Sequence, residues 1–126
     1  VDTIEAHLKE RNVDPSYYDL IVTGDLGTIG YDIALDLFQK HGTAITREFF
    51  QDCGLLIYRD GQPVLAGASG AGCSATVVYG HLLNRMKRGE IKRMLVVATG
   101  ALLSPLSFQQ NETIPCIAHA VSIEIM

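Results

Sequence analysis

Two short, continuous apolar runs constrain the fold of this chain more than any other feature. They are residues 19–23 (DLIVT) and residues 93–100 (RMLVVATG). Neither run alternates apolar and polar residues, as a strand with one solvent-exposed face would. Continuous apolar runs of this length are typical of strands in sheets that are covered on both faces. Residues 117–125 are also rich in isoleucine and valine and predict a last strand.

Apolar residues recur at helical spacing in the segments before and between these runs. Ile4 and Leu8 lie one helical turn apart, which predicts that residues 1–12 form a helix. Apolar residues recur at helical spacing from Ile33 until Gly42, a residue type that commonly ends helices. Helices that alternate with buried strands predict an α/β fold with a mixed, largely parallel sheet and helices on both faces.

The middle of the chain carries a turn signal. Asp60-Gly61 is a strong hairpin dipeptide because both residues tolerate positive φ. We therefore expect a hairpin with strands at residues 55–58 and 63–66. A loop of small residues follows at 67–74 (GASGAGCS), where glycine and alanine allow two backbones to approach closely.

The helix predicted at residues 74–88 is apolar around most of its circumference. Such a helix is usually buried on all sides, so we predict one buried central helix with His81 as a hydrogen-bonded core residue. One sheet in a domain of this size cannot cover the helix completely. Another structural unit should therefore pack on its outer face.

Composition limits the classes of protein to which the chain can belong. Its 126 residues fit a single domain, residues 1–126, and the net charge of −4 without a basic, aromatic face argues against a nucleic-acid partner. The three cysteines form neither a zinc motif nor a disulfide framework, so we expect no metal and no cofactor. No apolar run is long enough to span a bilayer. A start without Met, at a residue that already looks helical, suggests a piece of a longer protein.

Three stretches resemble a known family: residues 18–26 (YDLIVTGDL), 52–58 (DCGLLIY) and 94–119 (MLVVATGALLSPLSFQQNETIPCIAH). Through them the whole chain resembles the C-terminal half of the stage V sporulation protein AD family of endospore-forming bacteria, within the thiolase-like superfamily. The resemblance implies a thiolase-like half-domain whose central helix is buried against its counterpart in a similar N-terminal half. That counterpart would cover the outer face of the helix at residues 74–88.

The resemblance also implies a function in spores. Members of the family bind dipicolinic acid, a pyridine dicarboxylate that calcium accompanies in spores. They support its uptake into or release from the spore during sporulation and germination. The implied location is the periphery of the spore inner membrane, beside membrane-embedded proteins of the same transport complex. For this chain, the expected partners also include the N-terminal half of the same protein or a second copy in a homodimer.

Catalysis is not expected, because two residues of the related condensing enzymes are missing. Those enzymes combine a Cys nucleophile from the N-terminal half with a His and an Asn from the C-terminal half. The resemblance places the His near Gly24 and the Asn near Ala68, where this chain has neither residue type. Without a base and an oxyanion donor, acyl transfer loses its stabilisation. The alternative is a residual acyltransferase of the thiolase or ketoacyl-synthase type that uses Cys73 or an N-terminal Cys.

Four residues are candidate ligand contacts: Asp25, Ser69, Cys73 and Ser74. Asp25 follows a buried strand, where open α/β sheets place ligands, but it fits equally well as a cap of the next helix. Ser69, Ser74 and the N-terminus of the following helix offer donors to a carboxylate. Cys73 stands where the helix dipole favours a thiolate, with a buried packing role as the alternative.

Overall fold

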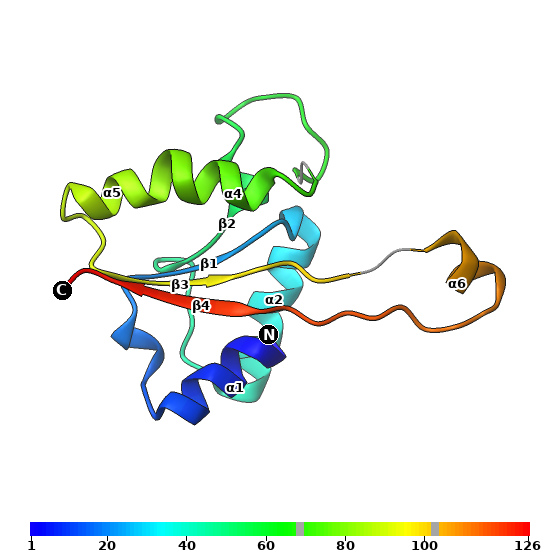
Figure 1. Cartoon of the computed structure of the whole chain (residues 1–126), viewed down its shortest axis with the longest axis horizontal. Coiled ribbons are helices and arrows are strands. Elements are labelled where there is room, and N and C mark those ends of the chain that lie inside the picture. The colour runs from blue at the N-terminus through cyan, green and yellow to red at the C-terminus, as the bar shows by residue number, and fades with distance from the viewer. Residues whose placement is uncertain (68–69, 102–103) are drawn as a thin grey trace.

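A mixed four-stranded sheet forms the centre of the protein (Figure 1). The computed structural model describes residues 1–67, 70–101 and 104–126. The strand order is β2-β1-β3-β4, in which the first three strands are parallel and β4 runs antiparallel to β3. The strands are β1 (Leu20–Thr23), β2 (Phe50–Asp52), β3 (Arg93–Val97) and β4 (Ala120–Glu124). The prediction of an α/β fold with a mixed, largely parallel sheet is confirmed.

The central position of β1 explains its continuous apolar sequence. Ile21 lies opposite Phe50 of β2 on one side and Leu95 of β3 on the other. Helices cover both faces of the sheet, and every residue of β1 is buried. The buried strands predicted at 19–23 and 93–100 are therefore confirmed, although β3 is shorter than its apolar run.

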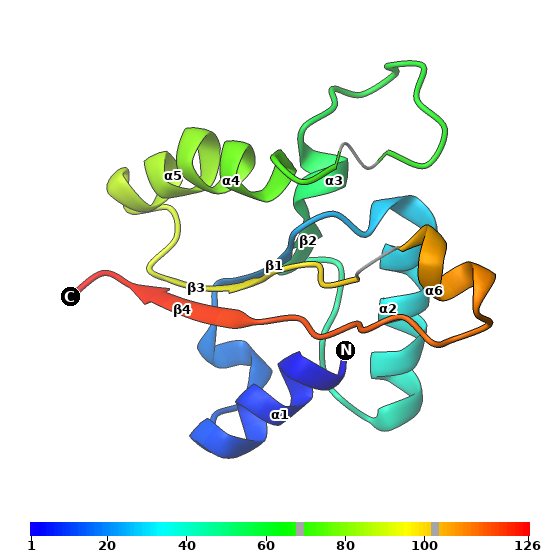
Figure 2. The same ribbon diagram turned by 45° about the vertical axis from the view of Figure 1, so that its right-hand side comes forward.

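Two helices cover one face of the sheet, as Figure 2 shows. They are α1 (Asp2–Arg11) and α2 (Gly27–His41). The ring of Tyr31 on α2 stacks on Phe50 of β2 with centroids 5.0 Å apart. Phe38 lies further along α2, and its ring contacts the same Phe50 ring edge-on with centroids 5.4 Å apart. These aromatic contacts fix α2 against the edge of the sheet that β2 forms.

A single run of helix, residues 73–87, covers the opposite face (Figure 2). It consists of α4 (Cys73–Val77), a π-helical segment η2 (Val78–Leu82) and α5 (Leu83–Lys87). Its inner side chains form a second core cluster with side chains of the sheet. The buried members include Cys73, Val77, Leu82 and Met86 of the helix and Leu20, Val22 and Met94 of the sheet.

The outer face of helix 73–87 is exposed in this chain, in line with the prediction that one sheet cannot cover the helix completely. Thr76, Gly80 and His81 are exposed, and Tyr79 keeps 73% of its surface accessible. One sheet buries only one face of a helix, and the described residues add no further layer above it. The prediction of His81 as a core residue is therefore wrong.

The hairpin expected from residues 55–58 and 63–66 does not form. The chain makes a short helix, α3 (Cys53–Leu56), directly after β2, and residues 63–66 pair with no strand. Gly61 has a φ of 76°, so the Asp-Gly dipeptide does make a turn. The turn does not join two strands, because Leu55 and Leu56 before it belong to α3 and pack against the core instead of forming a ladder.

Beyond β3 the described parts of residues 98–119 leave the sheet as an arm (Figure 1). The arm carries a short helix, α6 (Pro105–Gln109), which the sequence did not predict. At the base of the arm, Gly100 lies so close to the carbonyl of Ile117 that a Cβ would overlap it. The last strand, predicted at 117–125, is confirmed only over the length of β4.

Candidate functional site

The loops after β1 and β3 meet at one edge of the sheet because the two strands are parallel. Gly24 and Asp25 follow β1, and Thr99 lies just beyond the end of β3. The backbone N–H of Asp25 donates a hydrogen bond of 2.7 Å to Thr99 Oγ1. A Cβ built on Gly24 would lie 3.0 Å from both the N and the Oγ1 of Thr99. The two loops are therefore in direct contact.

Helix 73–87 begins at this same edge of the sheet. The backbone N–H of Gly70, just before the helix, donates a hydrogen bond of 2.7 Å to Asp25 Oδ2. The Cβ of Ser74 lies 3.5 Å from a Cβ built on Gly24. Three segments that are distant in sequence thus converge here. We call Gly24, Asp25, Gly70, Ser74 and Thr99 the loop cluster.

Asp52, which the sequence analysis missed, organises the start of α2. The residue is 1% exposed and ends β2. Its Oδ1 accepts hydrogen bonds from Thr23 Oγ1 at 2.7 Å and from the N–H of Leu26 at 2.9 Å, and its Oδ2 accepts from the N–H of Gly27 at 3.1 Å. Asp52 therefore satisfies the amides at the start of α2. The cap alternative for Asp25 is wrong, because the carboxylate of Asp25 faces Gly70 instead.

Two of the three cysteines, Cys53 and Cys73, are buried in the core between the sheet and helix 73–87. Cys73 begins the helix as predicted, but only 3% of it is exposed. Burial raises the pKa of the Cys53 thiol to about 12, and the nearby Cys73 and Asp52 add to the rise. Cys53 is therefore a protonated thiol at neutral pH and packs as a small apolar side chain. The third cysteine, Cys116, is exposed.

The structure brings three of the four predicted contact residues to one end of helix 73–87. Asp25 and Ser74 belong to the loop cluster, and Cys73 precedes Ser74 on the buried side of the helix. Ser69 lies outside the described residues, as does Ala68. The ligand-binding role of all four residues stays a prediction. The sequence analysis missed Thr99, although its place just beyond a buried parallel strand is the same signal that selected Asp25.

A cavity of about 290 Å³ lies at the same ends of β1 and β3, on the face of the sheet that α1 and α2 cover. Its lining includes the hydroxyl-bearing residues Thr3, Thr23 and Thr99 together with Cys116. Thr99 thus lines this cavity and also belongs to the loop cluster. The ends of the parallel strands therefore carry a cavity that could hold a small molecule, directly beside the loop cluster.

Comparison with known proteins settles the family. A family model described as "Stage V sporulation protein AD (SpoVAD)" matches residues 1–124. The chain belongs to the stage V sporulation protein AD family. Stage V sporulation protein AD of Bacillus subtilis (strain 168) is 49% identical over 123 residues, which cover 98% of this chain and 36% of the relative. The chain thus spans about a third of the length of this stage V sporulation protein AD, and the resemblance found in the sequence is confirmed.

Proposed function

We propose that this sporulation protein forms the C-terminal half of a thiolase-like protein that binds dipicolinic acid without catalysing a reaction. In this proposal it supports the uptake of the acid into the spore, or its release, during sporulation and germination. The observation that carries the proposal is the family match over residues 1–124. The convergence of two loops and the start of helix 73–87 at the carboxyl ends of parallel strands supports the loop cluster as the binding site, because α/β proteins commonly bind ligands there.

The charge of the loop cluster determines which form of the ligand fits. Ser74 and Thr99 offer hydroxyl groups, but Asp25 contributes a carboxylate and no member of the cluster is cationic. A free pyridine dicarboxylate would bring two more negative charges next to Asp25. We therefore favour the calcium chelate of the acid, or a site to which the remainder of the longer protein adds cations.

The exposed outer face of helix 73–87 supports the proposed partner of this half. Tyr79 and its exposed neighbours Thr76, Gly80 and His81 form this face. In this proposal the N-terminal half of the same protein covers this face, which would bury the large exposed aromatic ring of Tyr79.

Attachment to the spore inner membrane would depend on partner proteins in this proposal. None of the helices in the described part of the chain has both the length and the apolarity to cross a bilayer. The family resemblance supports a location at the periphery of the spore inner membrane, beside membrane-embedded proteins of the same transport complex.

Calorimetry with pyridine-2,6-dicarboxylate, with and without Ca²⁺, tests the proposal. One sample is this chain; the other is a chimaera in which this chain replaces the matched segment of the B. subtilis relative. We expect tight binding by the chimaera and weak or no binding by the chain, because the chain offers no cations in the loop cluster. The Ser74→Ala chimaera should bind less tightly, whereas Ser16→Ala, far from the loop cluster, should not change affinity. Tight binding by the chain alone, or none by the chimaera, would refute the proposal.

Mass spectrometry after incubation with acyl-coenzyme A tests the alternative, a residual acyltransferase. The burial of Cys73 and the absence of His at Gly24 support the non-catalytic proposal, so we expect no stable acyl adduct on folded chimaera. An adduct on Cys73, lost in Cys73→Ser, would favour the enzyme instead.

A further inference from the structure

Strand β4 is a regular sheet edge without the features that usually protect such edges. It lies at one end of the strand order and spans Ala120–Glu124. Monomeric proteins commonly protect an edge with proline, lysine, a bulge or a very short strand. β4 has no proline, no lysine and an unbroken register with β3, and its one charge is Glu124 at its end. The opposite edge, β2, spans only three residues and runs straight into α3.

The ladder with β3 determines which backbone groups of β4 point outward. Ala98 N–H donates to the carbonyl of His119, and Ile125 N–H donates to the carbonyl of Lys92. In an antiparallel pair, hydrogen-bonded and non-hydrogen-bonded positions alternate along the strand. The odd-numbered residues of β4 therefore bond to β3. The N–H and C=O groups of Ala120, Ser122 and Glu124 face the open edge, and no hydrogen bond among the described residues engages them.

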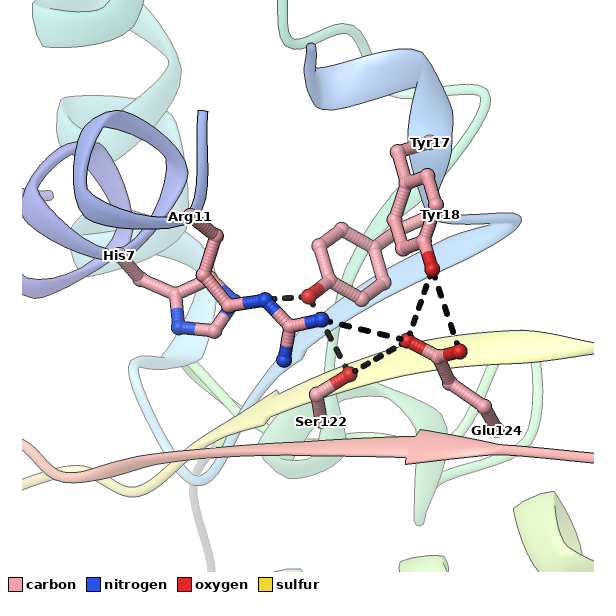
Figure 3. A network of polar contacts seen from close by, with 6 residues as sticks. All are labelled: His7, Arg11, Tyr17, Tyr18, Ser122 and Glu124. Carbon is pink, nitrogen blue, oxygen red and sulfur yellow. Dashed lines mark hydrogen bonds and ion pairs between the residues drawn. The ribbon is translucent and has the colours of Figure 1, made fainter. Parts of the chain in front are cut away.

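The side chains of Ser122 and Glu124 contact residues from the N-terminal part of the chain, as Figure 3 shows. Ser122 Oγ accepts a hydrogen bond of 3.2 Å from Tyr18 Oη. Both carboxylate oxygens of Glu124 lie 3.1 Å from Tyr17 Oη, which donates to them. Arg11 approaches the same carboxylate at 4.0 Å. The two side chains are thus held against the face of the sheet near α1 and do not cover their own backbone.

We propose that two copies of this chain pair through β4, antiparallel, about a twofold axis at Ser122. In this register Ser122 exchanges both backbone hydrogen bonds with Ser122 of the partner copy, and Ala120 does so with Glu124 of the partner copy. The outward positions of both strands are then the hydrogen-bonded positions of the new ladder, as an antiparallel pair requires. Each Glu124 faces an alanine rather than another carboxylate, so like charges do not meet.

The apolar side of β4 supports the same pairing. Val121 is 58% exposed, and with Ile123 it lines a groove beside helix 73–87 that Tyr79 also borders. In the proposed register Val121 lies opposite Ile123 of the partner copy, on the face that carries the helix. The pairing therefore buries β-branched side chains against each other where each copy alone exposes them.

Light scattering and amide hydrogen exchange on the 126-residue chain test this inference. We expect a dimer at about 100 μM, with slow exchange at the Ser122 amide. Ser122→Pro removes the side-chain hydroxyl and the outward N–H and should weaken the dimer by about tenfold or more, whereas Ser122→Ala removes the hydroxyl but keeps that N–H and should retain the dimer. Thermal unfolding confirms that Ser122→Pro folds. Val121→Lys, at an exposed position, should weaken the dimer in the same way without touching the backbone.

Three results would overturn the inference. One is a monomer at all concentrations up to about 100 μM. Another is a dimer that survives both Ser122→Pro and Val121→Lys but is lost in Thr76→Arg, which would place the contact on the outer face of helix 73–87. The third is a dimer whose Ser122 amide exchanges as fast as that of an open edge.

Discussion

Asp52 joins the ends of β1 and β2 to the start of α2 through one buried carboxylate. Its two oxygens hold Thr23, Leu26 and Gly27 in a network that excludes water. Because Asp25 directly precedes Leu26, the position of the loop cluster depends on a residue that does not belong to it. Local sequence patterns do not predict this structural role of Asp52, because its partners lie more than twenty positions earlier in the chain.

Replacing Asp52 with alanine should destabilise the protein by about 3 kcal/mol, because it leaves buried donors without an acceptor. Urea unfolding measures the change. Asp36→Ala is a matched control, since Asp36 makes only an exposed ion pair with Lys40 and should cost about 0.5 kcal/mol or less. Equal effects of the two substitutions would contradict the role assigned to Asp52.

Alkylation of the folded chain should discriminate among the cysteines. With the pKa of Cys53 raised to about 12 by burial, almost none of it is thiolate at neutral pH, whereas Cys116 is exposed. Brief treatment with iodoacetamide at about pH 7.5 should therefore label Cys116 and leave Cys53 unmodified by peptide mapping. Labelling of Cys53 at the rate of Cys116 would show that the core beneath helix 73–87 opens readily.

The elements that sequence periodicity predicted correctly are those whose burial is decided locally. The run at 19–23 and the helical spacing before Gly42 each carry a complete pattern. The errors concern segments whose structure depends on neighbouring elements. β2 is a strand because β1 pairs with it, and the Asp60-Gly61 turn lacks strands on either side. Likewise, the loop cluster was only partly predictable. Asp25 and Ser74 have local signals, while Thr99 joins them only through the sheet.

The carboxylate of Glu5 forms a clamp between α1 and the end of α2, and this clamp makes the stability of the fold depend on pH. Glu5 on α1 accepts hydrogen bonds from Thr43 Oγ1 at 2.7 Å and from His41 Nδ1 at 3.0 Å. Burial raises the pKa of Glu5, but these bonds and the charge of His41 outweigh it, so the folded pKa lies below 4.5. The clamp therefore stabilises the fold fully above pH 4.5 and loses its contribution as pH falls through the lower folded pKa.

Glu5→Gln should accordingly lower the free energy of unfolding by about 1 kcal/mol at pH 6, with a smaller loss below pH 4. Chemical denaturation at a series of pH values measures both. Glu10→Gln, on the exposed side of α1, serves as the control and should change little at any pH. A constant difference between Glu5→Gln and the parent chain across this range would contradict the clamp.

The base of the arm depends on the absence of a side chain at Gly100. Gly100→Ala places a Cβ on the carbonyl of Ile117, so we expect a loss of about 2 kcal/mol or more, measured by thermal unfolding. Gly80→Ala on helix 73–87 is the matched control. A Cβ there meets no atom within 4 Å, and the substitution should stabilise the helix by up to about 1 kcal/mol. A neutral Gly100→Ala would mean that the arm moves freely relative to β4.

At the scale of the whole molecule, helix 73–87 has one side buried against the sheet and one side exposed. Sequence reasoning anticipated that the helix needs cover on both sides, and the structure shows that this chain supplies only one. The chain matches 36% of its B. subtilis relative, so the relative contains a further two thirds of chain that could supply the other side. The proposed binding site would then lie where the loop cluster meets that additional structure.

Crystallography of the chimaera soaked with pyridine-2,6-dicarboxylate and Ca²⁺ tests the proposed binding site. We expect ligand density in contact with Asp25, Ser74 or Thr99, and with cations from outside this chain. Density confined to the cavity on the α1 side of the sheet, or ligand bound only to the remainder of the protein, would contradict it.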